Sequence, residues 1–269
     1  MKKKIIPSSY DIVGSREKAV AIVEIPDELK KQEKEIANSI MKRHKNVKSV
    51  LKKVSERIGK YRTRKYRLLA GERNTEVIHV EYGCKFKLDP RKVYFSPREG
   101  TERFRISRKV KPGERILIMF AGIGPYPIII AKKQPKVKIV AIEINPKAYE
   151  YMKKNISMNK LGDKIIPILG DVKKQCKKFY GEFDRVIMPL PHEGFKYLPI
   201  AYKCLKLRRG IIHLYLIEKE ENISKVKTII DDLKKKVKRN VKYKIRKVLP
   251  YAPRTNKYCV DITLKTQPG

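Results

Sequence analysis

Short apolar runs separated by longer segments of helical periodicity fill the chain from residue 116 onward. Alternation of strands and helices predicts a mostly parallel sheet with helices on both faces. The predicted strands are 116–120, 137–142, 165–169, 183–188, 210–217, 243–249 and 257–264, and the predicted helices are 126–133, 146–159, 173–179, 193–206 and 220–238.

The last two apolar runs are joined differently from the others. Only residues 250–256 separate them, which is too short for a crossover helix. We therefore expect these two strands to pair antiparallel, so that a hairpin closes a seven-stranded sheet.

The first part of the chain has a different pattern. Strand-like runs surround a single charged helical segment that ends near residue 43. A polar linker at 109–115 follows this region. This pattern predicts a small α+β domain at residues 1–107 and a second domain at 108–269. The expected strands of the small domain are 19–25, 47–54, 66–70, 75–88 and 93–96.

The charge of the chain is strongly one-sided. Lys and Arg number 66 against 28 Asp and Glu, a formal net charge of +38. Lys-rich thermophile proteins usually gain Glu as well, whereas self-repulsion this large is costly without a polyanionic partner. Because Trp is absent and no long basic amphipathic helix is evident, the pattern favours nucleic acid over a membrane surface.

Residues 60–67 interleave cations with tyrosines. Such a run suits phosphate contacts and base stacking. A strand edge protected by charge is an equally good interpretation, and the sequence leaves both open.

The cysteines and the N-terminus indicate the cellular compartment of the protein. Cys84, Cys176, Cys204 and Cys259 show no zinc-ligand spacing, so we expect no metal site. Residues 1–7 are too short in their apolar part for a signal peptide. The longest near-apolar stretch, 116–131, contains two Gly and two Pro and is too short to span a membrane. These features predict a cytoplasmic protein.

A glycine turn follows the strand at 116–120. Gly122 and Gly124 form this turn, and Glu143 comes nineteen residues later, at the end of the next predicted strand. Glycines let a backbone approach a nucleotide cofactor, and the acid binds its ribose hydroxyls. A dinucleotide would need a third glycine and a helix N-terminus at its pyrophosphate, so we predict S-adenosylmethionine (SAM), which has no phosphate.

Further candidates follow the third and fourth strands, where ligands of open α/β sheets bind. Asp171 can accept a hydrogen bond from an adenine amino group, cap the following helix, or do both. The sequence Pro189-Leu190-Pro191 lacks the leading polar residue and the final aromatic that amine-modifying methyltransferases have there, which argues against exocyclic amine chemistry. We expect His192 to start a helix and Asp184 to be structural, paired with Arg185.

Glu102 lies just before the cofactor-binding half of the chain. A carboxylate at this position can reach over the cofactor pocket. From the residues alone, a surface residue paired with a neighbouring Arg is the preferred interpretation.

Several motifs together resemble the archaeal and eukaryotic tRNA guanosine-37 N1-methyltransferases, from about residue 8 to the end of the chain. The resemblance implies a Rossmann-like, class I SAM-dependent methyltransferase sheet with a smaller N-terminal α+β domain. It also implies SAM as cofactor and the anticodon stem-loop of tRNA, with guanosine 37, as partner. The motifs are Tyr94-Phe-Ser-Pro-Arg98, Thr101-Glu102-Arg103, Met119-Phe-Ala-Gly-Ile-Gly-Pro-Tyr126, Met188-Pro-Leu-Pro191 and Tyr251-Ala-Pro-Arg254.

The resemblance implies a role for individual residues. Glu102 matches the carboxylate that takes the proton from guanine N1, and Arg62 matches an arginine that stabilises charge on guanine O6, with Arg64 as the alternative. The loop Pro189, Leu190 and Pro191 matches the loop that shapes the target pocket. The implied cofactor contacts are Tyr94, Phe120, Ala121, Gly122, Gly124, Glu143 and Asp171.

The chain departs from the family pattern at three places. Ile118 stands where the family has Asp, and Pro189 stands where it has Asn. The sequence begins where the family's middle domain begins, so we expect recognition through the anticodon stem and charge rather than the tRNA elbow. We also expect a monomer.

Two other functions remain open. One is a reaction of wyosine biosynthesis: aminocarboxypropyl transfer, which a sister family performs, or the methylation of a wyosine intermediate at carbon, which some archaeal relatives perform. Pro125, Leu190 and Pro191 favour the methyltransferase over the sister family. The other is non-catalytic RNA binding by a decayed SAM fold, which Ile118 supports and the intact Glu102, Glu143 and Asp171 oppose.

Overall fold

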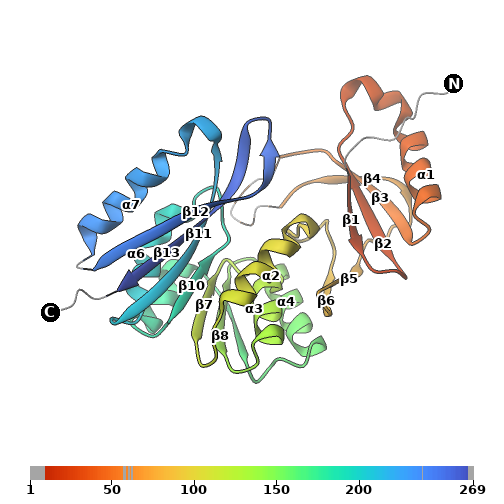
Figure 1. The fold of residues 1–269 in the computed structure, drawn as a ribbon. Helices are drawn as coiled ribbons and strands as arrows, with labels where there is room; N and C mark the ends of the chain where they lie inside the picture. Colours follow the sequence, from red (N-terminus) through yellow and green to blue (C-terminus); the bar gives the residue numbers. More distant parts are fainter. Residues whose placement is uncertain (1–9, 57–58, 60, 62, 238, 266–269) are drawn as a thin grey trace.

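The structure, a computed structural model, describes residues 10–56, 59, 61, 63–237 and 239–265. A seven-stranded sheet with helices on both faces forms one half of it, and a four-stranded sheet with one long helix forms the other (Figure 1). A two-stranded hairpin lies between them in the chain. None of the described helices is both long and apolar enough to cross a bilayer.

The seven-stranded sheet confirms the predicted alternation. Its order is β12-β13-β11-β10-β7-β8-β9. Neighbours from β9 to β11 are parallel, whereas β13 is antiparallel to both β11 and β12, as expected for the closing hairpin. The strands are β7 (Arg115–Met119), β8 (Lys138–Glu143), β9 (Ile165–Leu169), β10 (Arg185–Met188), β11 (Arg209–Lys219), β12 (Asn240–Ala252) and β13 (Thr255–Lys265).

The central strands are apolar throughout because both of their faces are buried. Along β7, Ile116 and Ile118 belong to one core, and Leu117 and Met119 belong to the other. The first core includes residues of α2 (Gly100–Lys109), α3 (Pro125–Lys133) and α4 (Pro146–Met158), and the second includes residues of α5 (Val172–Gln175), α6 (Leu198–Cys204) and α7 (Lys225–Lys236).

Three predicted helices are shorter than expected. Each is preceded or followed by a 3₁₀ turn, because the chain bends where a continuous helix was predicted. These turns are η3 (Cys176–Phe179), η4 (Gly194–Tyr197) and η5 (Glu220–Asn222).

The N-terminal sheet has the order β1-β2-β3-β4. Parallel β2 and β3 are connected through η1 and α1, whose Ile36 and Ile40 pack in a separate core. The sequence analysis missed β1, a short hairpin partner of β2. The elements are β1 (Tyr10–Gly14), β2 (Ala19–Val23), η1 (Asp27–Gln32), α1 (Glu33–Arg43), β3 (Val47–Lys53) and β4 (Tyr66–Gly71).

The region between the sheets differs from its prediction. The expected strand 75–88 is a hairpin of β5 (Val77–Glu81) and β6 (Cys84–Leu88), because Tyr82 and Gly83 turn the chain with φ of 48° and 73°. The expected strand 93–96 is absent from the described structure, where η2 (Pro97–Glu99) follows instead.

The β5–β6 hairpin and α2 both contact the large sheet's helices. The Asn155 side chain on α4 accepts a hydrogen bond from Lys87 N at 2.7 Å, and α2 packs against α3. The domain boundary predicted at residue 107 falls inside α2 and stays a prediction.

Candidate cofactor and active site

The glycine turn joins β7 to α3 through unusual backbone angles. Phe120, Gly122 and Gly124 have φ of 59°, 58° and 87°, and Ala121 N donates to Ile142 O at 2.9 Å, which fixes the turn to β8. A Cβ at Gly124 would lie 3.0 Å from a Met152 side-chain atom, whereas a Cβ at Gly122 would meet nothing within 4 Å. The turn is therefore packed on one side and open at Gly122, where a ligand can approach the backbone.

Glu143 is buried beside this turn, with 7% of its surface exposed. Its carboxylate accepts hydrogen bonds from Gly122 N and Asn145 N, both at 2.7 Å. Burial raises the pKa of Glu143, although these backbone N–H groups oppose the rise. Each oxygen keeps acceptor capacity, so the carboxylate can also bind hydroxyl groups of a ligand.

Asp171 follows β9 and caps α5, as one of its two interpretations predicted. Its Oδ1 accepts a hydrogen bond from Lys173 N at 2.8 Å. Burial and then the charge of Asp171 raise the pKa of Tyr197, whose ring meets Phe120 edge-on at 4.9 Å. Tyr197, which the sequence analysis did not single out, thus contacts Phe120 and responds to the charge of Asp171.

Tyr94 lies beside a buried ion pair. Its hydroxyl donates to Glu99 Oε1 at 2.9 Å, and Lys257 Nζ lies 2.8 Å from the same oxygen. Burial would raise the pKa of Glu99, but the charges of Lys257 and Arg103 and these hydrogen bonds outweigh it, so this pKa is lowered. The Tyr94 ring is 38% exposed, which leaves it accessible to a ligand.

Glu102 is buried on α2, with 5% exposure, so the expectation of a surface residue is wrong. The expected pairing with a neighbouring Arg is present, since Arg105 Nε and Nη2 donate to its carboxylate at 2.7 and 2.6 Å. The Tyr215 hydroxyl donates to Glu102 Oε1 at 2.6 Å, and burial raises the pKa of Tyr215, which keeps that proton in place. The sequence analysis missed Arg105 and Tyr215, although Arg105 stands one helical turn after Glu102.

Arg62 lies outside the described residues. Arg64, the alternative, pairs with Glu56 at 3.3 Å. β4 is an edge strand, and a cavity of about 490 Å³ lies beside its start, so RNA contact and edge protection both stay open. The cavity is lined by Val54, Thr63, Arg64, Lys65, Tyr66 and Arg91.

The loop of Pro189, Leu190 and Pro191 leads from β10 to η4. Leu190 O accepts from Gly194 N at 3.0 Å, and Pro191 O accepts from Ile217 N at 3.2 Å, which ties the loop to β11. The next residue, His192, meets the Tyr251 ring edge-on at 5.8 Å. The loop is therefore adjacent to the tip of the β12–β13 hairpin.

Asp184 corrects one prediction. It is structural, but its ion pair is with Lys206 at 2.8 Å, and it also accepts from Arg115 N. Arg185 pairs with Glu114 instead. Asp184 directly precedes β10, whose first residue is Arg185.

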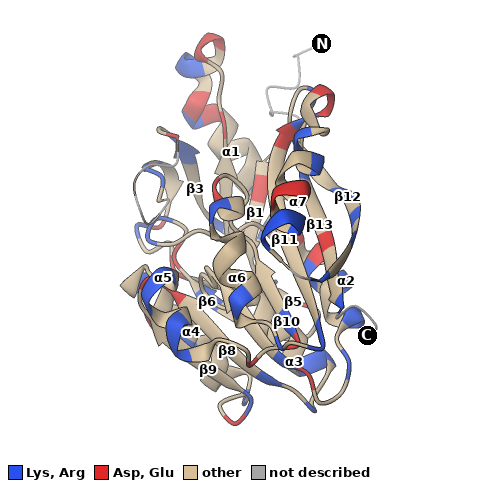
Figure 2. Ribbon diagram, turned by 90° about the vertical axis from the view of Figure 1, so that its left-hand side faces the viewer, with Lys and Arg blue, Asp and Glu red and all other residues tan. Residues whose placement is uncertain are grey.

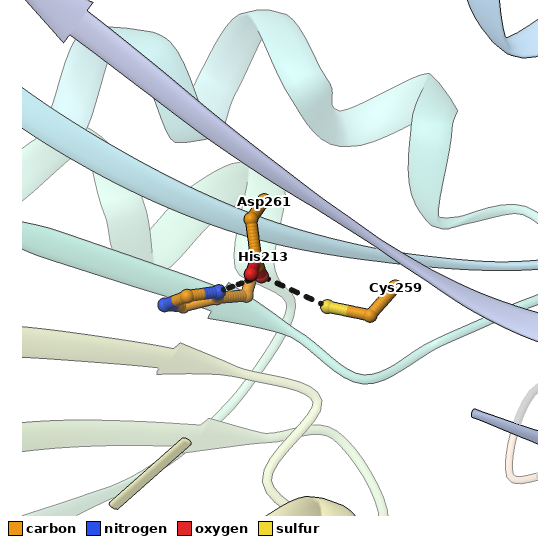
Figure 3. A group of neighbouring side chains, drawn as sticks. All are labelled: His213, Cys259 and Asp261. Carbon is orange, nitrogen blue, oxygen red and sulfur yellow. Dashed lines mark hydrogen bonds and ion pairs between the residues drawn. The ribbon is translucent and has the colours of Figure 1, made fainter. Parts of the chain in front are cut away.

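His213, Cys259 and Asp261 place three possible metal-ligand atoms within 4.8 Å of one another (Figure 3). Arg105 and Lys109 bind Asp261, and Arg185 contacts the ring of His213. Burial raises the pKa of Cys259 and so disfavours its thiolate. A metal ion here would face three cations, and the contacts of the group are those of an ion-pair network.

Two protein-family models match the sequence of this chain. The family model for the TRM5/TYW2 methyltransferase domain matches residues 77–246, and the model for the TYW2 N-terminal domain matches residues 2–75. The chain belongs to the TRM5/TYW2 methyltransferase family. Its seven-stranded sheet is accordingly the Rossmann-like sheet of class I SAM-dependent methyltransferases that the resemblance implied.

Individual relatives support this family assignment. Trm5b of Pyrococcus abyssi is 44% identical over 213 residues, 79% of this chain and 61% of the relative. The crystal structure of that Trm5b superposes with a TM-score of 0.85 at 40% identity, covering 96% of this chain and 76% of the other. This chain spans about 61% of the length of the curated Trm5b relatives that it matches.

Two further structures resemble this family member. The complex of aTrm5 and tRNALeu has a TM-score of 0.81 at 38% identity, covering 97% of this chain and 73% of that chain. Methanocaldococcus jannaschii TYW2 in complex with AdoMet has a TM-score of 0.73 at 30% identity, covering 96% of this chain and all of the other.

Proposed function

We propose that the protein transfers a methyl group from SAM to N1 of guanosine 37 in tRNA. The observation that carries the proposal is the buried carboxylate of Glu102, whose position and partners suit a general base. The similar P. abyssi Trm5b is named a tRNA (guanine(37)-N(1))-methyltransferase, which supports the same reaction.

The glycine turn and its acids fit SAM. Glu143 can accept hydrogen bonds from the ribose hydroxyls, Asp171 can accept one from the adenine amino group, and the space at Gly122 admits the cofactor. When bound, SAM supplies a methyl group that is electrophilic because it is attached to a positively charged sulfur. Tyr94 and Phe120 are proposed to contact the cofactor as well.

The reaction needs a base because guanine N1 carries a proton and is a poor nucleophile. In our proposal Glu102 accepts that proton, and the electron pair left on N1 forms the bond to the methyl carbon. The carbon–sulfur bond breaks, and its electron pair neutralises the sulfur. A cation near guanine O6, the role assigned to Arg62 by resemblance, would stabilise the charge that develops there. The loop of Pro189, Leu190 and Pro191 would bound the target base.

A second candidate is aminocarboxypropyl transfer to a wyosine precursor at the same position of tRNA. The match of residues 2–75 to the TYW2 N-terminal domain favours it. The two reactions would share the SAM site and differ in which carbon attached to sulfur is attacked.

Nucleoside mass spectrometry distinguishes the candidates. After incubation of unmodified tRNA with protein and SAM, we expect guanosine 37 to gain one methyl group, positioned at N1 by comparison with a 1-methylguanosine standard. A product carrying the aminocarboxypropyl mass, seen with a tRNA that bears the wyosine precursor, would replace this proposal with the second candidate. No modified nucleoside with either tRNA would indicate a binding protein without activity.

The proposed partner is the anticodon stem-loop of tRNA, and we propose a cytoplasmic monomer.

Basic positions occur on several helices, including α4, α5, α6 and α7 (Figure 2), so charge alone does not select one surface as the RNA-binding surface. The edge strand β12 adds an ordered row, since Lys242, Lys244 and Arg246 are exposed at alternate positions. Such a row suits a phosphate backbone.

Affinity for tRNA is expected to fall steeply with salt, because Lys and Arg release counterions when they neutralise phosphates. A joint Gln substitution of Lys242, Lys244 and Arg246 is expected to reduce the slope of log K against log salt by about 2–3, since each phosphate contact contributes roughly 0.7–0.9. Fluorescence anisotropy measures both. The matched control substitutes Lys147, Lys154 and Lys160, which are exposed near the opposite edge of the sheet; equal slopes for the two triple variants would remove β12 from the RNA surface.

A further inference from the structure

The carboxylate of Glu102 has most of its acceptor capacity already in use. Oε1 accepts from Arg105 Nη2 and from the Tyr215 hydroxyl, both at 2.6 Å, and Oε2 accepts from Arg105 Nε at 2.7 Å. A carboxylate oxygen can accept about two hydrogen bonds. Among the described contacts, Oε1 is therefore saturated, and Oε2 keeps one lone pair for an incoming proton.

Arg105 is itself held from the opposite side. Its Nη1 lies 3.0 Å from Asp261 Oδ2, and its Nη2 lies 3.3 Å from Cys259 Sγ. Both partners are on β13. The guanidinium thus cannot rotate without breaking contacts to both the helix and the sheet.

A buried chain of contacts extends from Asp261. His213 donates from Nδ1 to Asp261 Oδ1 at 2.6 Å, and its Nε2 accepts from Arg185 Nη1 at 2.6 Å. Burial and the charge of Arg185 lower the pKa of His213 to about 4 despite its bond to Asp261, so the ring is neutral near pH 7. Arg185 makes two hydrogen bonds to Glu114 at 2.7 and 2.8 Å. Contacts from α2, β10, β11 and β13 therefore fix the orientation of Arg105.

We propose that Arg105 is a positioning residue for Glu102. Its two N–H groups fix the plane of the carboxylate and leave the remaining lone pair of Oε2 for the proton of the substrate base. This inference rests on the proposed function, because it assigns the base of the same reaction a partner.

Arg105 is the cation that faces Glu102 among its described neighbours. The other groups that face it are Tyr215 on β11, Tyr126 on α3 and Cys259 on β13, and burial raises the pKa of each well above its ordinary value. All three are neutral near pH 7. Asp261, the next charge outward, is paired with Arg105 and Lys109. Loss of the Arg105 charge would therefore leave Glu102 without compensation.

The test compares two variants. Arg105→Lys keeps the positive charge but loses the paired N–H donors of the guanidinium, and Arg105→Gln loses the charge as well. Arg108→Gln on the exposed side of the same helix is the matched control. Single-turnover methylation is measured at saturating SAM and tRNA, with affinities for SAM and tRNA and a thermal melt for each variant.

In Arg105→Lys we expect the chemical step to slow about tenfold or more, because the carboxylate is misoriented. Affinities for SAM and tRNA should be unchanged. In Arg105→Gln, which loses both the charge and the paired N–H donors, the chemical step should slow at least as much as in Arg105→Lys.

Two outcomes would overturn the inference. They are a wild-type single-turnover rate in Arg105→Lys and a loss that appears only in the affinity for SAM or tRNA. If Arg105→Gln does not fold, Arg105→Lys decides alone. If the wild-type protein itself modifies no tRNA, the proposed function fails first, whereas an active wild type with an unaffected Arg105→Lys removes only this inference.

Discussion

Glu102→Gln is expected to lower single-turnover methylation by about 10²–10⁴-fold, the usual contribution of a general base. The amide has the same shape and remains between Arg105 and Tyr215, so packing of α2 should be kept. It cannot accept the guanine proton, so the loss should lie in the chemical step. Rapid quench kinetics at saturating SAM and tRNA measures this step directly.

Glu150→Gln, on the exposed face of α4, controls for the removal of one negative charge. Binding of SAM and tRNA to both variants should match the wild type. A wild-type single-turnover rate in Glu102→Gln would show that another group takes the proton.

Glu143→Ala is expected to weaken SAM binding by about ten- to a hundred-fold, since an unpaired buried hydrogen-bonding group costs roughly 1–3 kcal/mol. The change also removes the acceptor of Gly122 N and Asn145 N, so the glycine turn loses an anchor. Isothermal calorimetry with SAM measures the effect.

Asp163→Ala provides the control for Glu143→Ala, because Asp163 is exposed in the loop before β9. It should bind SAM as the wild type does. Unchanged calorimetric affinity in Glu143→Ala, with an intact melting transition, would place the ribose elsewhere.

The large sheet could be predicted because its signals are local. The central strands β7, β8 and β10 are apolar runs buried on both faces, and the helices between the strands have their own period. Residues 116–120 and 137–142 therefore stand out without tertiary information. The hairpin at 77–88 could not be separated from a single strand, because its turn is Tyr82-Gly83 rather than a pair of typical turn residues. The β1 strand was missed because it is only five residues long and partly polar.

Only the positions of some site residues could be predicted from the sequence. Residues at the ends of β7 and β8 were located by motif and spacing, and the structure brings Gly122 and Glu143 into hydrogen-bond contact. The roles of these residues in binding stay predictions. The partners of Glu102 were beyond reach, because Tyr215 lies 113 residues away and the partner of Arg105, Asp261, lies 156 residues away from it.

The position of β13 sets an order of events during synthesis. This strand pairs with β11 on one side and β12 on the other, although it follows both along the chain. At about 5–20 residues per second, roughly 8–30 s pass between the synthesis of Arg105 and that of Asp261. During that interval Arg105 lacks its anchor, and β11, once made, has no partner from β13. The orientation of Glu102 is thus completed only when the final strand enters the sheet, which makes the proposed base among the last groups of the nascent protein to reach its place.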